Sequence, residues 1–287
     1  MNTADRQSSG WLQRALRSNL VARLTYPYSI DRYLEQIDPL LAADRIAGRI
    51  TAIEHPTARS VRIRVRPNAA WTGFRAGQFV RLGVEINGRR AERCFSPAQS
   101  QHDASGQLEF TMAVPPGGRV TGYLKERAPV GATVWLSQAD GVFHMPEERP
   151  DRVLLISAGS GITPVISMLR TLADEGHRGR ISFIHYAPRR SEELYPEALQ
   201  ALSAQLPNLD LHILHPEEGD ALFSREQLST LVPDFAAAEA FVCGPQPLLA
   251  ATRQIWADAG LAERLHQEAY ALAPAAPENG ETEVRFA

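Results

Sequence analysis

A glycine-containing turn between an apolar run and an amphipathic segment has the clearest chemical character in this chain. Residues 153–156 are apolar, which is typical of a strand buried on both faces of a parallel sheet. Glycine lets the backbone turn tightly and approach a ligand closely. We expect the following helix to begin at its proline, with exposed N–H groups and a positive dipole end that bind a pyrophosphate. The alternative is an ordinary strand–helix turn. The turn consists of Gly159, Ser160, Gly161, Ile162, Thr163 and Pro164.

A pair of arginines follows the next predicted strand, at 181–186. In nucleotide-binding α/β domains, an acidic residue at this place binds the ribose 2′-hydroxyl of NADH, whereas an arginine suits the 2′-phosphate of NADPH. Here Arg189 and Arg190 follow the strand, and the next carboxylate along the chain is Glu192. Because guanidinium groups pair well with phosphate, the sequence favours NADPH over NADH. The alternative is a pair of solvated arginines.

Alternating strands and helices must position these two turns. From residue 152 onward, apolar runs alternate with amphipathic segments. We expect parallel strands at 153–157, 181–186, 209–214 and 240–243. We expect helices at 164–175, 191–206, 224–231 and 247–259. This alternation predicts a doubly wound α/β domain with a parallel sheet.

Before that domain, the hydrophobic period changes to two. Val61, Ile63 and Val65 alternate with arginines, which is typical of a half-buried antiparallel strand. Turn residues separate this strand from its neighbours. Further short strands are expected at 78–84, 89–95, 108–114 and 133–136. The pattern predicts a small antiparallel β-barrel that carries one short helix at 120–126.

An amphipathic segment precedes the predicted barrel. Between Trp11 and Leu24, leucines recur every four residues and arginines occupy the other faces. We expect a helix that packs on the domain behind it. A helix that touches a membrane surface is the alternative. A second helical segment is expected at 30–41.

Composition excludes several classes of protein. The 287 residues are enough for two domains, and 44% apolar with 22% charged residues is ordinary for a soluble globular protein. A net charge of -3 without a basic aromatic patch argues against binding of nucleic acid. The sequence has no apolar run near the ~20 residues of a membrane span, and no signal peptide. Cys94 and Cys243 lie too far apart in the sequence to suggest a cysteine metal site or an iron–sulfur cluster.

A β-barrel followed by a nucleotide-binding α/β domain resembles the ferredoxin–NADP reductase superfamily. The family's flavin-binding strand motif matches Arg93, Cys94, Phe95 and Ser96. The resemblance implies that Arg93 pairs with a flavin phosphate, that Phe95 stacks on the flavin ring and that Ser96 hydrogen-bonds near flavin N5. Phe95 replaces the family's usual tyrosine, so stacking is kept and a hydroxyl hydrogen bond is lost.

A second flavin element of the family is a glycine-rich turn that opens the barrel's helix. Its match here consists of Gly117, Gly118, Arg119, Val120 and Thr121. N–H groups and a hydroxyl at such a turn would face a pyrophosphate. Since FAD contains a pyrophosphate and FMN does not, the element implies FAD.

Two further elements are implied to lie beside the nicotinamide. The family's Cys-Gly-Pro element matches Cys243, Gly244 and Pro245, and its closing Glu-x-aromatic element matches Glu268 and Tyr270. The resemblance implies that Ser96, Cys243 and Glu268 line the transfer site. The alternatives are a buried apolar cysteine and a solvated carboxylate at a helix end.

Residues 31–35 and 71–80 resemble a narrower group, the bacterial flavin reductases that serve membrane fatty-acid desaturases. Those proteins carry a [2Fe–2S] domain after the nucleotide domain, and its cysteine spacing is absent here. We therefore expect a truncated form or a reductase with a separate iron–sulfur partner. The expected segments are an N-terminal helical extension (1–45), an FAD-binding β-barrel domain (46–147), an NAD(P)-binding α/β domain (148–270), and a linker with the start of a missing ferredoxin-like domain (271–287).

The expected function is hydride transfer from NAD(P)H to FAD and single-electron transfer to a [2Fe–2S] ferredoxin-type acceptor. A membrane-bound desaturase is a candidate final partner. One alternative is a flavin reductase or NAD(P)H oxidase that acts on small acceptors, and another is a non-catalytic subunit that binds a partner. We expect a cytoplasmic protein, either free or peripheral to the inner membrane face.

Overall fold

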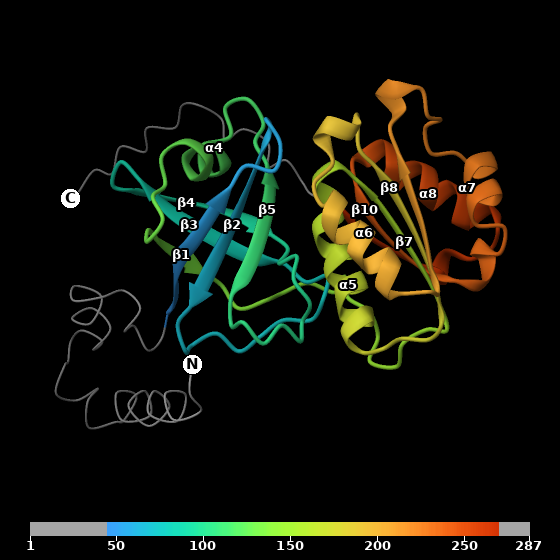
Figure 1. The fold of residues 1–287 in the computed structure, drawn as a ribbon, viewed down its shortest axis with the longest axis horizontal. Coiled ribbons are helices and arrows are strands. Elements are labelled where there is room, and N and C mark those ends of the chain that lie inside the picture. Colours follow the sequence, from blue (N-terminus) through green and yellow to red (C-terminus); the bar gives the residue numbers. More distant parts are fainter. Residues whose placement is uncertain (1–44, 270–287) are drawn as a thin grey trace, which may run out of the picture.

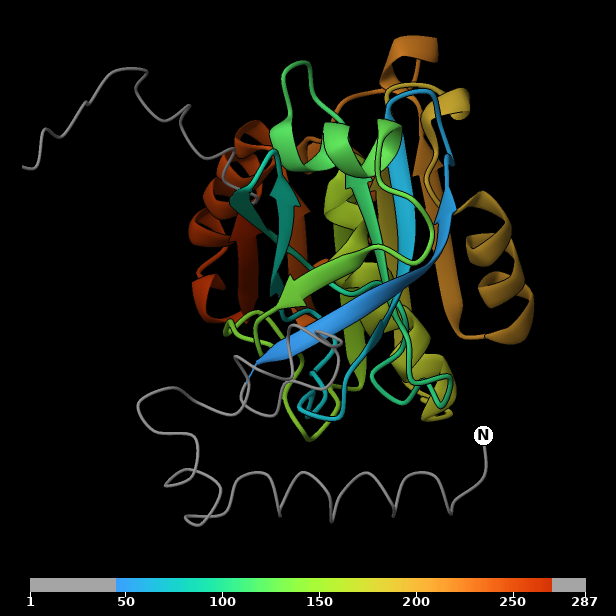
Figure 2. The same ribbon diagram turned by 90° about the vertical axis from the view of Figure 1, so that its left-hand side faces the viewer.

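A computed structural model describes residues 45–269, which form two sheets that stand side by side (Figure 1). The first sheet is antiparallel, with six strands in the order β4-β3-β6-β1-β2-β5. Its strands cross one another steeply in Figure 2, so the sheet is curled and barrel-like as predicted. The elements are β1 (Ile46–Glu54), β2 (Ser60–Pro67), β3 (Val80–Ile86), β4 (Arg89–Phe95), β5 (Leu108–Ala113), helix α4 (Arg119–Glu126) and β6 (Thr133–Leu136).

The period-two pattern of β2 separates the barrel's interior from solvent. Val61, Ile63 and Val65 are fully buried, while the intervening arginines are partly or fully exposed. Asn87 and Gly88 form the β3–β4 turn with φ of 53° and 73°. Both angles are positive, as a tight hairpin turn of this kind requires. Helix α4 buries Val120 and Leu124 over the same interior.

The second sheet is parallel, with five strands in the order β11-β10-β7-β8-β9. From the central strand β7, the chain adds β8 and β9 on one side of the sheet and β10 and β11 on the other. This is the predicted doubly wound arrangement. The strands are β7 (Arg152–Ala158), β8 (Arg180–Tyr186), β9 (Leu209–Leu214), β10 (Glu239–Gly244) and β11 (Leu265–Ala269). The helices are α5 (Ile162–Asp174), α6 (Pro196–Gln205), α7 (Arg225–Leu231) and α8 (Gln246–Asp258). Short 3-10 turns are η2 (Gly159–Gly161), η3 (Arg190–Glu192), η4 (Pro216–Glu218), η5 (Phe235–Ala237) and η6 (Ala262–Arg264).

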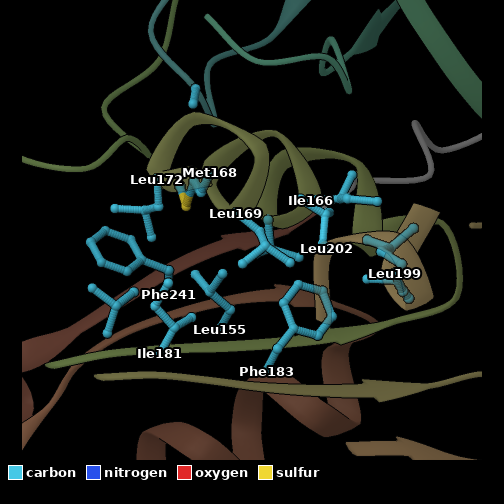
Figure 3. Close-up of a cluster of buried hydrophobic side chains, with 14 of the residues drawn as sticks. Leu155, Ile166, Met168, Leu169, Leu172, Ile181, Phe183, Leu199, Leu202 and Phe241 are labelled. Atoms are coloured by element: carbon cyan, nitrogen blue, oxygen red, sulfur yellow. The ribbon is translucent and has the colours of Figure 1, made fainter. Parts of the chain in front are cut away.

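Helices cover both faces of the parallel sheet. On one face, Met168, Leu169 and Leu172 of α5 lie against Leu155 and Phe241 of the sheet (Figure 3). Helix α6 adds its leucines to that layer, and α7 and α8 bury theirs on the opposite face. A fully buried side chain of this kind contributes roughly 1.5–3 kcal/mol. The parallel sheet therefore has a hydrophobic core on each side.

Three sequence-based expectations about these elements were wrong in detail. Strand β11 was not predicted, because Leu265–Ala269 is a polar edge strand without an apolar run. Helix α5 begins at Ile162, so Pro164 is its third residue, where the lack of an N–H still costs nothing. Helix α6 begins at Pro196 rather than at residue 191, since the residue before a proline is driven out of the helical region.

The two sheets meet along a polar contact centred on Tyr195, which is 2% exposed. Its hydroxyl donates to Thr111 Oγ1 of β5 at 2.6 Å. The guanidinium groups of Arg62 and Arg170 lie 4.5 and 5.1 Å from the centre of its ring. Arg62 also donates to Leu194 O at 2.6 Å. The contact is thus held by hydrogen bonds and cation–π interactions from both domains.

The helices predicted at 11–24 and 30–41, residue Tyr270 and the segment 271–287 lie outside the described residues. Among the helices of residues 45–269, none has the length and hydropathy required to cross a bilayer.

Candidate functional site

The reversal of strand order places two loops next to each other at the carboxyl ends of β7 and β10. Gly159 has a φ of 53°, in the left-handed region, and Gly161 lies directly on the end of β10. A Cβ on Gly161 would stand 2.3 Å from Cys243 O and 2.9 Å from Gly244 Cα. The loop can therefore take this position only with glycine, and it leads into the start of α5. Ligands of open α/β sheets bind at this kind of switch point.

Polar side chains occupy adjacent strands at the same level of the sheet. Cys243 of β10 is paired in register with Glu268 of β11 and Ser157 of β7, and Ser157 is paired with His185 of β8. The Ser157 hydroxyl lies 2.8 Å from His185 Nδ1. Burial lowers the pKa of His185 to about 4, so the imidazole is neutral at pH 7. Ser157 and His185 were not predicted as site residues, because they lie within apolar strands.

Glu268 combines burial with an unsatisfied oxygen. Its Oε2 is buried and has no hydrogen-bond partner among residues 45–269. Burial raises the pKa of Glu268 to about 7, because desolvation disfavours the carboxylate. Burial, assisted by the Glu268 charge, raises the pKa of the Cys243 thiol well above its usual range. The predicted alternative for Glu268, a solvated carboxylate at a helix end, is therefore wrong.

The end of β4 in the antiparallel sheet approaches this carboxylate. Burial is the main cause that raises the pKa of Cys94, the Arg81 charge lowers it, and the Glu268 charge raises it further. The Glu268 carboxylate of β11 therefore lies close enough to β4, in the other domain, to affect the Cys94 thiol. Two residues beyond Cys94, Ser96 is 1% exposed, and its Oγ has no partner in the described part of the chain. Phe95, between them, is half-buried and packs against the barrel core.

Ser96 Oγ and Glu268 Oε2, two buried oxygens from opposite domains, therefore lack partners among residues 45–269. Buried polar groups in folded proteins are almost always hydrogen-bonded, so each exception calls for a ligand, water or functional reason. A hydroxyl and a carboxyl group suit the polar edges of a flavin ring and of a nicotinamide. The residues present fit an FAD and a nicotinamide nucleotide at this boundary.

The start of α4 provides a separate turn on the barrel. Gly117 has a φ of 73°, and a Cβ on Gly118 would stand 2.6 Å from Thr121 Oγ1 and 3.0 Å from Pro115 O. The first N–H groups of a helix have no acceptor within the helix, so this turn suits a pyrophosphate. Arg119 is exposed beside it. Arg93 is exposed on β4, and its guanidinium donates to Glu92 O at 2.8 Å.

The arginines predicted to bind a 2′-phosphate are exposed beyond the end of β8. Arg189 Nε donates to Glu217 Oε2 at 2.7 Å, and the Arg190 backbone N–H donates to Glu218 Oε1 at 3.0 Å. Neither glutamate was predicted, because the first carboxylate after β8 along the chain is Glu192. They follow β9, which is the neighbour of β8 in the parallel sheet. The signal was available, since the ends of neighbouring parallel strands share one edge.

Apart from the two arginines beyond β8, the described site residues predicted from the sequence lie in two places, the switch point of the parallel sheet and the β4–α4 region of the barrel. Ser160, Thr163, Gly244 and Pro245 lie at the switch point with the two glycines and Cys243. Thr163 Oγ1 donates to Ser160 O at 3.3 Å, and Pro245 caps α8. The barrel residues lie on β4 and at the start of α4, which pack together. Tyr270 is not among the described residues.

Two protein families match consecutive parts of this chain. Residues 49–145 match the family described as "Oxidoreductase FAD-binding domain", and residues 155–254 match "Oxidoreductase NAD-binding domain". The first match covers the antiparallel sheet, and the second covers most of the parallel one. These matches support FAD and a nicotinamide nucleotide as the cofactors.

Curated relatives carry names of reductases. The chain is 32% identical over 288 residues to an "NADPH oxidoreductase" of Mycobacterium tuberculosis, with 99% of this chain and 74% of the relative covered. It is 30% identical to a "Glycine betaine monooxygenase reductase subunit" of Chromohalobacter salexigens, with 70% of this chain and 57% of the relative covered. The chain thus spans little more than half the length of the monooxygenase subunit.

Solved structures share the fold at low sequence identity. The flavohem-like FAD/NAD-binding domain of the nitric oxide dioxygenase from Vibrio cholerae has a TM-score of 0.70 at 22% identity, with 79% of this chain and 99% of that chain covered. The ferredoxin–NADP+ reductase from Plasmodium falciparum has a TM-score of 0.68 at 17% identity, with 78% and 95% covered. The chain has an FAD-binding domain and an NAD-binding domain, and 99% of its length aligns with the mycobacterial oxidoreductase. It therefore belongs to the ferredoxin–NADP reductase superfamily of NAD(P)H oxidoreductases.

Proposed function

We propose that this protein takes a hydride from NADPH onto bound FAD. It would then pass single electrons to a [2Fe–2S] protein or to an oxygenase component. When bound, FAD would supply the chemistry that converts a two-electron donor into a one-electron source. The chain's own contribution is to place the two cofactors and to control the protons around them.

The observation that carries this proposal is the pair of buried, unpartnered atoms at the domain boundary. Within the described residues, Ser96 Oγ and Glu268 Oε2 lack acceptors or donors, and they come from opposite domains. Ser96 would hydrogen-bond the flavin, and Cys243 would contact the nicotinamide. Because its pKa is about 7, the Glu268 carboxyl group holds or releases a proton near neutral pH.

Flavin binding is proposed for β4 and the start of α4. Arg93 would pair with a flavin phosphate, Phe95 would stack on the ring, and Thr121 with the N–H groups after Gly118 would hold the pyrophosphate. Among residues 45–269, the exposed Arg93 guanidinium makes one hydrogen bond, to the carbonyl of the preceding residue. It therefore has donors left for a phosphate.

Nucleotide binding is proposed for the switch-point loop and the arginines beyond β8. The N–H groups of the Gly159–Gly161 turn, which leads into α5, would bind the pyrophosphate, and Arg189 and Arg190 would bind the 2′-phosphate of NADPH. The name of the mycobacterial relative, an NADPH oxidoreductase, agrees with this choice.

The proposed acceptor is an iron–sulfur or oxygenase component. Similar proteins are named as the reductase components of a glycine betaine and a propane monooxygenase and as component C of a methane monooxygenase. A membrane-bound fatty-acid desaturase is a finer proposal, which rests on the resemblance of residues 31–35 and 71–80 to reductases of desaturase systems.

The test is anaerobic reduction of the purified protein after incubation with FAD. We expect a yellow protein that NADPH bleaches faster than NADH at equal concentration. Reduced protein should then transfer electrons to a [2Fe–2S] ferredoxin faster than to oxygen. Colourless protein that takes up no FAD would overturn the proposal, and faster transfer to oxygen would favour an NAD(P)H oxidase.

A further inference from the structure

The two loops beyond β8 and β9 are joined by hydrogen bonds at the place proposed for the adenosine ribose. Glu217 N donates to Pro188 O at 3.0 Å. The Glu217 carboxylate accepts from Arg189 Nε at 2.7 Å, and the Glu218 carboxylate accepts from the Arg190 backbone. One 3-10 turn, η4, therefore provides partners for both arginines.

The position of η4 is held by a buried histidine. His215 is 5% exposed, and its Nε2 lies 2.7 Å from Glu193 Oε1 in the neighbouring loop. The His215 backbone N–H donates to Asp220 Oδ2 at 2.6 Å. These contacts tie both ends of the η4 loop, so the location of Glu217 beside Arg189 follows from the packing of the two loops.

The charge of the two loops is unfavourable to a phosphate. Residues 187–193 and 215–220 contain two arginines and five carboxylates, so acidic side chains outnumber the arginines. A 2′-phosphate dianion that reaches Arg189 must either displace the Glu217 carboxylate from the guanidinium or bind next to that negative charge. The 2′-hydroxyl of NADH is uncharged and can donate a hydrogen bond to a carboxylate.

We propose that Glu217 is a specificity-determining residue that lowers the preference for NADPH over NADH by competing with the 2′-phosphate for Arg189. This inference rests on the proposed nucleotide site. The Arg189 and Glu217 side chains are 59% and 53% exposed, and the ion pair is screened by salt. Removal of the competing charge should therefore change the preference by about two- to fivefold, which lies in the upper part of the range measured for exposed ion pairs.

The first measurement is direct binding to the full chain, without any turnover. Adenosine 2′,5′-bisphosphate and adenosine 5′-monophosphate are titrated calorimetrically into wild type and Glu217→Gln. We expect the bisphosphate to bind about two- to fivefold more tightly to Glu217→Gln, and the monophosphate to bind no more tightly. Equal changes for both probes would overturn the inference.

The second measurement is kcat/KM for NADPH and NADH with the FAD-loaded protein. The NADPH/NADH ratio should rise in Glu217→Gln, and the rise should shrink as salt is added. Glu226→Gln, an identical charge change on exposed α7, should leave the ratio unchanged. A ratio that stays constant in Glu217→Gln, or rises equally in Glu226→Gln, contradicts the inference.

A double-mutant cycle separates this inference from the proposed function. In an Arg189→Ala background, Glu217→Gln should lose most of its effect, because the competition acts through the guanidinium. An unchanged effect would overturn the competition mechanism while leaving the nucleotide site intact. Wild type that binds neither probe and is reduced by neither nucleotide would instead refute the proposed function.

Discussion

The boundary between the two domains has two regions with opposite hydrogen-bonding states. In the region around Tyr195, the buried hydroxyl has an acceptor and the flanking guanidinium groups of Arg62 and Arg170 have carbonyl acceptors. In the region around Ser96 and Glu268, buried oxygens have no partner within residues 45–269. The polar groups of the first region are satisfied by contacts between the two domains, whereas in the second region Ser96 Oγ and Glu268 Oε2 stay without a partner in the described part of the chain.

The difference assigns separate tasks to the two regions. Satisfied polar contacts hold the domains in one relative position, and each hydrogen bond to a charged group contributes about 1.5–3 kcal/mol. Unsatisfied buried atoms cost free energy unless a ligand pairs with them. The contacts of Tyr195 therefore hold the two domains in place. Ser96 and Glu268 keep hydrogen-bonding groups with which a ligand can pair.

The largest effect on stability is expected from removing the Tyr195 side chain, whose hydrogen-bonding groups are satisfied. Tyr195→Ala removes a buried ring between two guanidinium groups, so the free energy of unfolding should fall by about 3–5 kcal/mol. Tyr195→Phe keeps the ring and loses only the bond to Thr111, for about 1 kcal/mol. Urea denaturation of the full chain measures both. A loss below about 1 kcal/mol in Tyr195→Ala would mean that this contact does not hold the domains.

The next effect concerns the unsatisfied region. Glu268→Gln keeps the shape of the side chain and removes its ionisable proton, so NADPH-dependent electron output should fall about 10²-fold. Stopped-flow reduction of the FAD-loaded protein gives the rate. Glu263→Gln, on the exposed turn η6, is the matched control and should keep the wild-type rate. Equal rates in both variants would remove Glu268 from the proposed chemistry.

A smaller effect is expected at the switch point that supports the unsatisfied region. Gly161→Ala would place a Cβ against Cys243 O, and the resulting overpacking should cost about 1–3 kcal/mol in stability. Gly122→Ala in α4 meets open space and should be neutral or stabilising by up to about 1 kcal/mol. Thermal unfolding of the two variants tests the contrast, which fails if their stabilities shift alike.

The fourth effect is a pH dependence of stability that sharpens the comparison. The folded pKa of Glu268 is about 7, above the ordinary 4.5, so between these values the folded protein binds more protons than the unfolded chain. Stability contributed by the protonated group is therefore lost as pH rises from about 4.5 to about 7. Relative to wild type, Glu268→Gln should be more stable at about pH 8 than at about pH 5. Denaturation of FAD-free protein at both pH values checks the sign, and an equal difference at both would contradict it.

Local patterns in the sequence were sufficient for most of the fold. The period-two alternation of Val61, Ile63 and Val65 predicts β2, and the apolar run 153–156 predicts β7, because burial on one or two faces imposes these patterns. Glycine at 159 and 161 similarly predicts a turn that needs a positive φ and close backbone contact. The motifs and their order along the chain were sufficient to identify the family by resemblance.

Other features depend on residues that are distant in the sequence, and only the tertiary structure decides them. Strand β11 has no apolar pattern, so its place beside β10, and with it the burial of Glu268, follows from packing. The ion pair of Arg189 with Glu217 joins residues 28 positions apart, and the Tyr195–Thr111 bond joins residues 84 apart. A local pattern carries no information about such pairs, because their energy exists only after the sheets have formed and the domains have met.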